Sequence, residues 1–392
     1  MSSQPLTVLG GLSAEQFMSE YWQKKPLLVR QAMPALIGMF EPEDLFDLAL
    51  EDGVTARLLT QHGKQHDQWK VKNSPFTKKE LNTKNLPPLW TLLVQAVDHW
   101  SIELAELWQQ FDFIPQWRRD DIMISYAPEG GSVGRHFDQY DVFLVQASGK
   151  RHWQLGQTCD DGSTQLVPNQ PLRLLNDLGE VVFDEVLEAG DLLYVPPRLA
   201  HYGVAQGQDC LTCSFGFRMP NPAQLLERLT DELLGNHSLN TPVSDLLRTA
   251  TVSSGAVLTD DLNALRQALM SVLYDPESFQ HAVMVLLSEP KYPESLPESE
   301  AFDTEAWQHL MQVGARIRLD PAARLLYVEA PDQQLRFYCN GEALDIDEQH
   351  QVLLQSLADG AWLEVQQWSL LDQETLNDWL ADGMLLVSEP DD

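Results

Sequence analysis

Between Asp121 and Phe217 the sequence is a succession of short strand-like segments with no helical segment between them. Each segment is rich in β-branched and aromatic residues and is bounded by glycine, proline or polar turn residues, as in the run from Gly190 to Pro196. Short strands that follow one another in this way are typical of antiparallel all-β folds. The pattern therefore predicts a barrel or a double-sheet jelly roll at the centre of the chain.

One of these segments, Gly134–Val145, carries the pair His136 and Asp138. On a strand, residues two apart face the same way, so the imidazole and the carboxylate would lie side by side. Two histidines and one carboxylate form the metal-binding triad that leaves open positions on Fe(II). The pair alone is weak evidence, because most such pairs are ordinary surface polar residues. A metal site requires a second histidine from elsewhere.

The run Gly190–Gly203 offers that second histidine. A glycine turn, a strand and the proline stop Pro196-Pro197 precede His201. A late strand of a jelly roll can return to the mouth of the barrel beside an early one. The sequence therefore predicts that His201 joins His136 and Asp138 as a metal ligand.

Arg151 lies on the strand that follows the predicted ligand strand, with Trp153 and Leu155 on its own face. If that face points inward, an unpaired cation would be buried at a cost of several kcal/mol, so an anion must meet it. A guanidinium binds a carboxylate through two parallel hydrogen bonds. Ser125, on the preceding strand, could donate to the same carboxylate. If the face points outward, Arg151 is solvated; the strand pattern leaves both orientations open.

The remaining chain reads as helices with a few short strands. A capping-box pattern, Ser13 followed by Gln16, opens a first helix that ends near Trp22, and Lys24–Arg30 is predicted as a short strand. Further helices are predicted near 43–50, 88–108, 222–235, 260–274, 277–288, 304–312, 347–358 and 372–381, and strands near 317–319, 325–329, 335–339 and 384–387. Residues 236–254 read as a long polar loop, and the proline-rich segment 289–299 reads as a linker.

These patterns divide the chain into three parts. Residues 1–219 would form the all-β domain with its N-terminal helices, 220–290 a helical region, and 291–392 a small winged-helix-like α+β domain. A chain of 392 residues exceeds a single typical core, so several domains are expected.

The charge of the chain limits its partners. The net charge is −32; residues 221–392 carry 8 basic and 30 acidic side chains, a net of −22, which leaves −10 for residues 1–220. Such a field repels phosphate backbones, so direct nucleic-acid binding is not expected. The acidity gives either a solvated, soluble surface or a surface that attracts a basic protein. The first residues lack a signal-peptide pattern and no apolar run is long enough to span a membrane, which predicts a cytoplasmic protein.

Several motifs together resemble the Jumonji-C family of Fe(II) and 2-oxoglutarate oxygenases. They are His136-x-Asp138, Arg151 on the following strand, and Gly190-Asp191-x-Leu193-Tyr194-x-Pro196 followed by His201. The sequence of Asp138–Phe143 and the N-terminal motif Tyr21-Trp22-x-Lys24-Lys25-Pro26 are similar to those of bacterial ribosomal oxygenases. The resemblance extends over essentially the whole chain and is strongest over 120–220.

The resemblance implies a double-stranded β-helix (cupin) catalytic domain, a helical dimerisation region and a winged helix not used for DNA. It implies that His136, Asp138 and His201 bind Fe(II), and that Arg151 holds the far carboxylate of 2-oxoglutarate. The expected reaction is a dioxygenase reaction that consumes O2 and hydroxylates an arginine of large-subunit ribosomal protein sixteen. Of the residues near the mouth, Tyr140 is expected in the cavity wall close to the substrate, and Glu129 and Asp141 are expected to steer the basic substrate.

Two groups of alternatives stay open from the sequence. Within the family, the reaction could be histidine hydroxylation of another ribosomal protein or demethylation of methyl-lysine. Outside it, a metal-free jelly-roll scaffold could use an acidic dimer to bind partners, although a scaffold would have no need of a complete triad.

Overall fold

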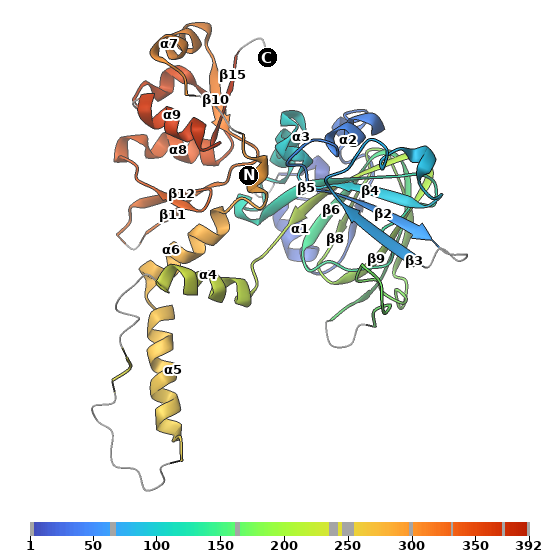
Figure 1. Ribbon diagram of the computed structural model, residues 1–392, viewed down its shortest axis with the longest axis horizontal. Helices are drawn as coiled ribbons and strands as arrows, with labels where there is room; N and C mark the ends of the chain where they lie inside the picture. The colour runs from blue at the N-terminus through green and yellow to red at the C-terminus, as the bar shows by residue number, and fades with distance from the viewer. Residues whose placement is uncertain are drawn as a thin grey trace. The chain divides into compact units, whose positions relative to one another are not determined.

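A computed structural model describes residues 4–62, 68–160, 165–234, 242–244, 255–297, 301–330, 332–370 and 373–389 (Figure 1). Internal contacts divide the chain into two compact units, Met1–Met219 and Pro220–Asp392. Each unit has its own hydrophobic core. None of the helices in the described ranges is both long and apolar enough to cross a membrane.

The first unit is built on one antiparallel sheet that wraps around the core. Its strands follow the order β1-β8-β6-β9-β5-β4-β2-β3, and β7 pairs with β6. The strands are β1 (Leu27–Val29), β2 (Ala56–His62), β3 (Gln68–Asn73), β4 (Trp90–Val94), β5 (Arg119–Ala127), β6 (Asp141–Thr158), β7 (Phe183–Glu188), β8 (Leu192–Val195) and β9 (Leu199–Phe217). The strand-rich block that the sequence predicts is therefore present, extended by four strands from before residue 100.

The N-terminal elements agree with the sequence in part. Helix α1 (Ala14–Glu20) begins with the predicted capping box, in which Ser13 and Gln16 exchange hydrogen bonds, and α2 (Pro42–Leu48) and β1 also lie where they are expected. The predicted helix over 88–108 is wrong. Its first part is the fully buried strand β4, and only α3 (Ile102–Glu106) is α-helical. An apolar run without alternation fits a buried strand as well as a helix, and here the pairing with β2 and β5 decides.

Two long strands, β6 and β9, form the centre of the sheet. They pair from Asp141 with Phe217 to Thr158 with Leu199, and the register shifts near Ser148 and after Leu155. Gly149 lies at the first irregularity with φ +64°, and a Cβ there would lie 2.8 Å from the Asp209 carbonyl oxygen. The segments predicted as separate strands on either side of Gly149 are thus one continuous strand.

The segment that carries His136 is not a regular strand. Strand β6 begins only at Asp141, and His136 forms an isolated antiparallel bridge with His201. The expectation that His136, Asp138 and Tyr140 share one face of a strand is therefore wrong. Their convergence comes from the local pairing with β9 and not from strand periodicity.

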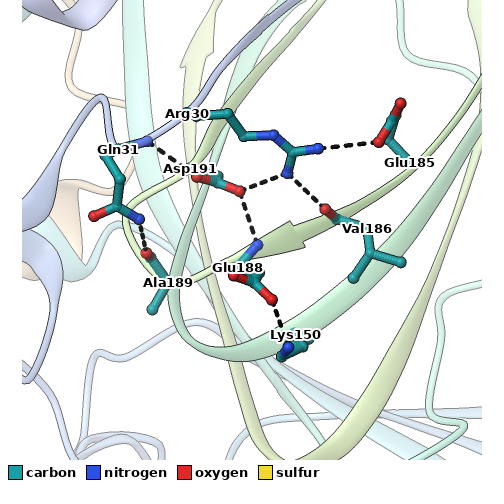
Figure 2. A network of polar contacts seen from close by, with 8 residues as sticks. All are labelled: Arg30, Gln31, Lys150, Glu185, Val186, Glu188, Ala189 and Asp191. Carbon is teal, nitrogen blue, oxygen red and sulfur yellow. Dashed lines mark hydrogen bonds and ion pairs between the residues drawn. The ribbon is translucent and has the colours of Figure 1, made fainter.

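The edge formed by β1 and β8 is fastened by Asp191, the acidic residue that follows the glycine turn (Figure 2). Its carboxylate accepts hydrogen bonds from the backbone N–H groups of Gln31 and Glu188, both at 3.0 Å, and from the Arg30 guanidinium at 2.7 Å. Arg30 also donates to the Val186 carbonyl. This part of the Gly190-Asp191 motif therefore fixes the start of β8, and with it the approach to His201.

The second unit combines helices with two small sheets. Its helices are α4 (Pro222–Leu234), α5 (Thr259–Leu273), α6 (Pro276–Ser288), α7 (Thr304–Val313), α8 (Gln351–Ala358) and α9 (Gln373–Ala381). Its strands are β10 (Arg316–Leu319), β11 (Leu325–Glu329), β12 (Leu335–Cys339), β13 (Glu342–Leu344), β14 (Leu363–Glu364) and β15 (Leu385–Ser388), which form the three-stranded sheets β14-β10-β15 and β11-β12-β13. The predicted helices and strands of this region are confirmed. Most of the predicted loop 236–254 lies outside the described residues.

Candidate metal and cosubstrate site

His136, Asp138 and His201 lie together, each with one ligand atom within 4.8 Å of the others. The Asp138 Oδ2 atom is 3.6 Å from His201 Nε2 and 3.9 Å from His136 Nε2. No other group of three or more His, Cys, Asp or Glu side chains in the described part of the chain has this geometry. Two imidazoles and one carboxylate at this spacing match the donor set that binds Fe(II) with open positions.

Both imidazoles are oriented by their Nδ1 atoms. His136 Nδ1 lies 3.0 Å from the Gly134 carbonyl oxygen, and His201 Nδ1 lies 2.9 Å from the Leu199 carbonyl oxygen. A carbonyl can only accept, so each Nδ1 carries the proton and each Nε2 presents its lone pair to the site. Burial, followed by the proximity of His136, lowers the pKa of His201 to about 4, which keeps that imidazole neutral at pH 7.

The turn before His136 is anchored to the strand that carries His201. The Ser132 hydroxyl donates to the Gly203 carbonyl at 2.7 Å and accepts from the Gly134 N–H at 3.0 Å. Gly134 has φ +86°, and a Cβ there would lie 2.5 Å from the Leu174 side chain. This turn therefore requires glycine, and it fixes His136 opposite His201.

Arg151 points inward and is 2% exposed, so the structure decides between the two orientations that the sequence leaves open. Its Nε donates to the Thr212 hydroxyl at 2.9 Å, and Thr212 donates in turn to Gln146 Oε1 at 2.9 Å. The Nη2 atom of Arg151 is buried without a hydrogen-bond partner among the described residues. A buried guanidinium edge of this kind is strongly unfavourable until an anion binds it.

Two further donors lie near Arg151. Ser125 pairs across the sheet with Thr212, and its hydroxyl contacts the Thr212 carbonyl at a long 3.4 Å. The buried indole N–H of Trp153 has no partner among the described residues. The cavity thus combines a metal donor set with two buried donors that lack a partner among the described residues, Arg151 Nη2 and the Trp153 indole N–H. This combination fits an iron ion chelated by a dicarboxylate.

These groups face a single cavity of about 460 Å³. Its lining includes all three residues of the triad, Arg151, Ser125 and Tyr140. Tyr140 is in the wall as expected, and the guanidinium carbon of Arg218 lies 4.9 Å from the centre of its ring. Burial, followed by the charge of Asp138, raises the pKa of the Tyr140 phenol well above its ordinary value, so the ring presents a neutral hydroxyl.

The two acidic residues expected at the mouth are placed differently. Asp141 is fully buried, and its carboxylate accepts hydrogen bonds from Tyr194, Gln23 and Arg118 at 2.7, 2.9 and 3.2 Å. The expectation that Asp141 steers substrate is wrong, because its charge is already compensated inside the fold. Glu129 is exposed on the turn after β5 and is not among the residues that line the cavity.

Sequence reasoning missed several residues that support the site, namely Ser132, Gln146, Thr212 and Arg218. Each of these residues acts through a partner that is remote in sequence, so no local sequence pattern predicts its role. The one available signal was strand periodicity at Thr212, which places a polar side chain inside an apolar strand between Leu211 and Cys213.

Comparison with known proteins agrees with this geometry. Residues 106–225 match the JmjC domain family, and residues 255–390 match the ROXA-like winged helix family. These matches confirm the cupin-type first domain and the winged helix in the second unit.

The similarity also extends over whole proteins. The chain is 42% identical to a probable ribosomal oxygenase of Haemophilus influenzae over 96% of both chains, and 32% identical to the ribosomal protein uL16 3-hydroxylase of Escherichia coli over 91% of both. The solved structure of YcfD from Escherichia coli superposes with a TM-score of 0.83 at 30% identity, covering 96% of this chain and 98% of that one. A YcfD structure in complex with cobalt and 2-oxoglutarate gives 0.79 at 29% identity, covering 95% and 98%. The chain therefore belongs to the JmjC-type ribosomal oxygenases.

Proposed function

We propose that this protein is an Fe(II)- and 2-oxoglutarate-dependent dioxygenase that hydroxylates an arginine side chain of ribosomal protein uL16. The observation that carries the proposal is the pairing of the His136, Asp138 and His201 triad with the buried Arg151 in one cavity. Similarity to the uL16 3-hydroxylase, at 32% identity over 91% of the chain, supports the substrate and the position of the hydroxylation.

In this function His136, Asp138 and His201 would hold Fe(II), and Arg151 would bind the far carboxylate of 2-oxoglutarate. When bound, the metal and cosubstrate supply the oxidative activation of O2 that inserts one oxygen atom into a C–H bond. The chain's own residues orient the reactants. Thr212 holds the guanidinium of Arg151 in place, and Ser125, in the cavity wall, would donate to the same carboxylate.

Tyr140 would contact the substrate side chain. Its ring lies in the cavity wall and already packs against the guanidinium of Arg218. This packing supports the proposal that the ring accepts a flat cation such as a substrate arginine. On the turn after β5, the exposed carboxylate of Glu129 would attract the basic protein.

Succinate release by purified protein tests the reaction. The protein is incubated with Fe(II), 2-oxoglutarate and each member of a panel of ribosomal proteins, and the products are analysed by fragmentation mass spectrometry. The proposal predicts a gain of one oxygen atom on an arginine of uL16. Hydroxylation of a histidine, or loss of a methyl group from lysine, would select another reaction of the family. If none of the proteins is turned over, the result would favour the alternative of a metal-free jelly-roll scaffold.

We further propose a homodimer formed through the helices that follow residue 220. In α5 the side chains of Leu262, Leu265 and Leu269 are spaced three and four residues apart and are all more than half exposed. An exposed leucine stripe at helical spacing is costly in water, and a second copy of the same helix would cover it. We also infer a cytoplasmic location, where ribosomal proteins are made.

A further inference from the structure

One segment of this acidic chain has the opposite charge. Residues 64–84 contain six lysines and two acidic residues, a net charge of +4, in a protein whose net charge is −32. In the described part of this segment, Lys70 and Lys72 lie on β3, and Lys78, Lys79 and Lys84 follow it. All five are exposed. We refer to these five residues as the lysine surface.

The lysine surface has a defined place at the edge of the sheet. Strand β3 ends the strand order of the sheet and, among the described strands, pairs with β2 alone, beside which Figure 1 shows it. Lys70 and Lys72 are two residues apart and share one face. Glu80 pairs with Lys72 and also accepts hydrogen bonds from the N–H and the hydroxyl of Thr77, which folds the following segment back beside the strand. Lys72 and the segment that carries Lys78 and Lys79 are therefore held together by Glu80.

These lysines differ from the other cations of the protein. Among the basic side chains of the described residues, only Arg57, Lys70, Lys78, Lys79 and Lys84 have no hydrogen-bond, ion-pair or aromatic partner. Elsewhere the cations are engaged, as in the pair Lys150–Glu188. Although the chain has more than twice as many acidic as basic residues, four of the five lysines have no partner among the described residues, and Lys72 alone pairs, with Glu80.

Strand β3, which carries Lys70 and Lys72, lies beside the turn that holds His136 in the cavity wall. Trp69 on β3 packs beside Gly134, so that a Cβ on this glycine would lie 3.2 Å from the indole ring. The backbone N–H of Trp69 donates to the Gln170 side chain at 3.3 Å, and the chain after Gln170 reaches the cavity wall at Arg173. An anionic partner on the lysine surface would therefore lie close to a protein whose side chain enters the cavity.

We propose that the lysine surface binds the phosphate backbone of RNA, so that the enzyme can act on its substrate while that substrate is bound to ribosomal RNA. The choice of RNA rests on the proposed ribosomal substrate, because a ribosomal protein carries RNA on its basic surface. The overall negative charge prevents binding elsewhere on the chain and restricts contact to this surface. The proposal thus departs, at this edge of the sheet, from the expectation that nucleic acid is not bound.

Salt-dependent binding of a fluorescein-labelled stem-loop RNA by the full-length protein tests the proposal. Four lysine–phosphate contacts predict that affinity falls by roughly 50- to 150-fold between about 50 and 200 mM salt. The variant Lys70→Gln, Lys78→Gln, Lys79→Gln, Lys84→Gln should bind more weakly and lose most of this salt dependence. The matched control Lys24→Gln, Lys25→Gln, Lys150→Gln, Lys291→Gln has the same change in net charge and should bind like the wild type.

Turnover separates this proposal from the proposed function. The quadruple variant should hydroxylate free uL16 like the wild type but act more slowly, by about the same factor as its loss of RNA affinity, when uL16 is supplied on an rRNA fragment. RNA binding is measured without turnover, so it stands even if no ribosomal protein is hydroxylated. The proposal is overturned if the wild type does not bind the RNA at 50 mM salt, if both quadruple variants bind alike, or if polyglutamate binds as tightly as RNA.

Discussion

His136 and His201 pair through two backbone hydrogen bonds, from each N–H to the other's carbonyl oxygen, at 3.0 and 2.8 Å. Their ring centres lie 4.1 Å apart. The bridge fixes the two imidazoles opposite each other before any metal binds, because the backbone and not the side chains sets their separation. The site is thus preorganised by the pairing of the turn before β6 with the central strand β9.

Loss of one imidazole should weaken metal binding. His201→Ala removes one of three donors and leaves the bridge intact, so affinity for Co(II) should fall by at least the roughly 10- to 100-fold that loss of a supporting outer ligand typically costs. The visible absorption of Co(II) during titration measures this without turnover. His152→Ala is the control, since this imidazole pairs with Asp184 on the outer side of the sheet. Equal Co(II) affinity in the two variants would rule out the triad as the metal site.

Arg151→Ala should raise the 2-oxoglutarate concentration needed for half-maximal turnover. The variant removes a charged, bidentate contact in a buried site, which is worth about 2–3 kcal/mol or roughly 30- to 150-fold in affinity. Isothermal titration with 2-oxoglutarate on the Co(II)-loaded protein measures the change. Arg135→Ala, an exposed arginine beside the metal site, should bind like the wild type. An unchanged affinity in Arg151→Ala would place the far carboxylate elsewhere.

Substitution of Asp141 should lower the stability of the fold, whereas substitution of Glu129 should weaken the interaction with the substrate. Asp141→Ala leaves the buried Arg118 without its ion-pair partner at 3.2 Å. The free energy of unfolding, measured by urea titration, should therefore fall by about 3–5 kcal/mol. Glu129→Gln should leave stability unchanged and raise KM for the basic substrate about two-fold, an effect that added salt removes. A normal unfolding midpoint in Asp141→Ala would show that the carboxylate has no structural role.

The metal triad could be predicted from the sequence because its residues belong to patterns with a chemical reason. His-x-Asp and the histidine after a proline stop are each ambiguous, but one all-β block can bring them together. The backbone structure that brings the three residues together nevertheless differs from the expected strand. A single bridge to His201 positions His136, and the sequence around Gly134 does not distinguish a tight turn from the start of a strand.

Other features depend on contacts that no local pattern encodes. In the sequence Asp141 resembles an ordinary surface carboxylate. In the structure it is buried and accepts hydrogen bonds from Arg118 and Tyr194, which belong to other elements. The apolar sequence Trp90–Val94 is compatible with a helix and with a buried strand. Pairing with the neighbouring strands β2 and β5 makes it a strand. Thr212 acquires its role from the register between β6 and β9, which a sequence alone does not set.

The leucine stripe of α5 should control assembly. Leu262→Glu with Leu265→Glu places two carboxylates where the second copy would pack, so the dimer should dissociate to monomers at micromolar concentration. Light scattering during size-exclusion chromatography measures the mass. Ala264→Glu with Gln267→Glu adds the same charge on the opposite face of the helix and should leave the dimer intact. Similar masses for the two variants would contradict assembly through this stripe.

Asp320 should make the stability of the second unit depend on pH. It is 7% exposed, and its carboxylate accepts a hydrogen bond from the Ala322 N–H at 2.8 Å. Burial raises the pKa of Asp320 to about 6, against an ordinary value of 3.8. The folded state therefore binds the proton more tightly than the unfolded state. The stabilisation from this group is complete below pH 3.8 and is lost as pH rises through 6.

Between pH 5 and pH 7 the free energy of unfolding should fall by about 1 kcal/mol because of this group alone. Asp320→Asn keeps an oxygen acceptor for Ala322 but cannot titrate, so it should lack that part of the pH dependence. Urea titrations of the two proteins at each pH, followed by tryptophan fluorescence, give the difference directly. The comparison uses the change in this difference with pH, so any effect of the substitution that does not depend on pH cancels. Parallel pH profiles for the two proteins would mean that Asp320 is already ionised in the folded state at pH 5.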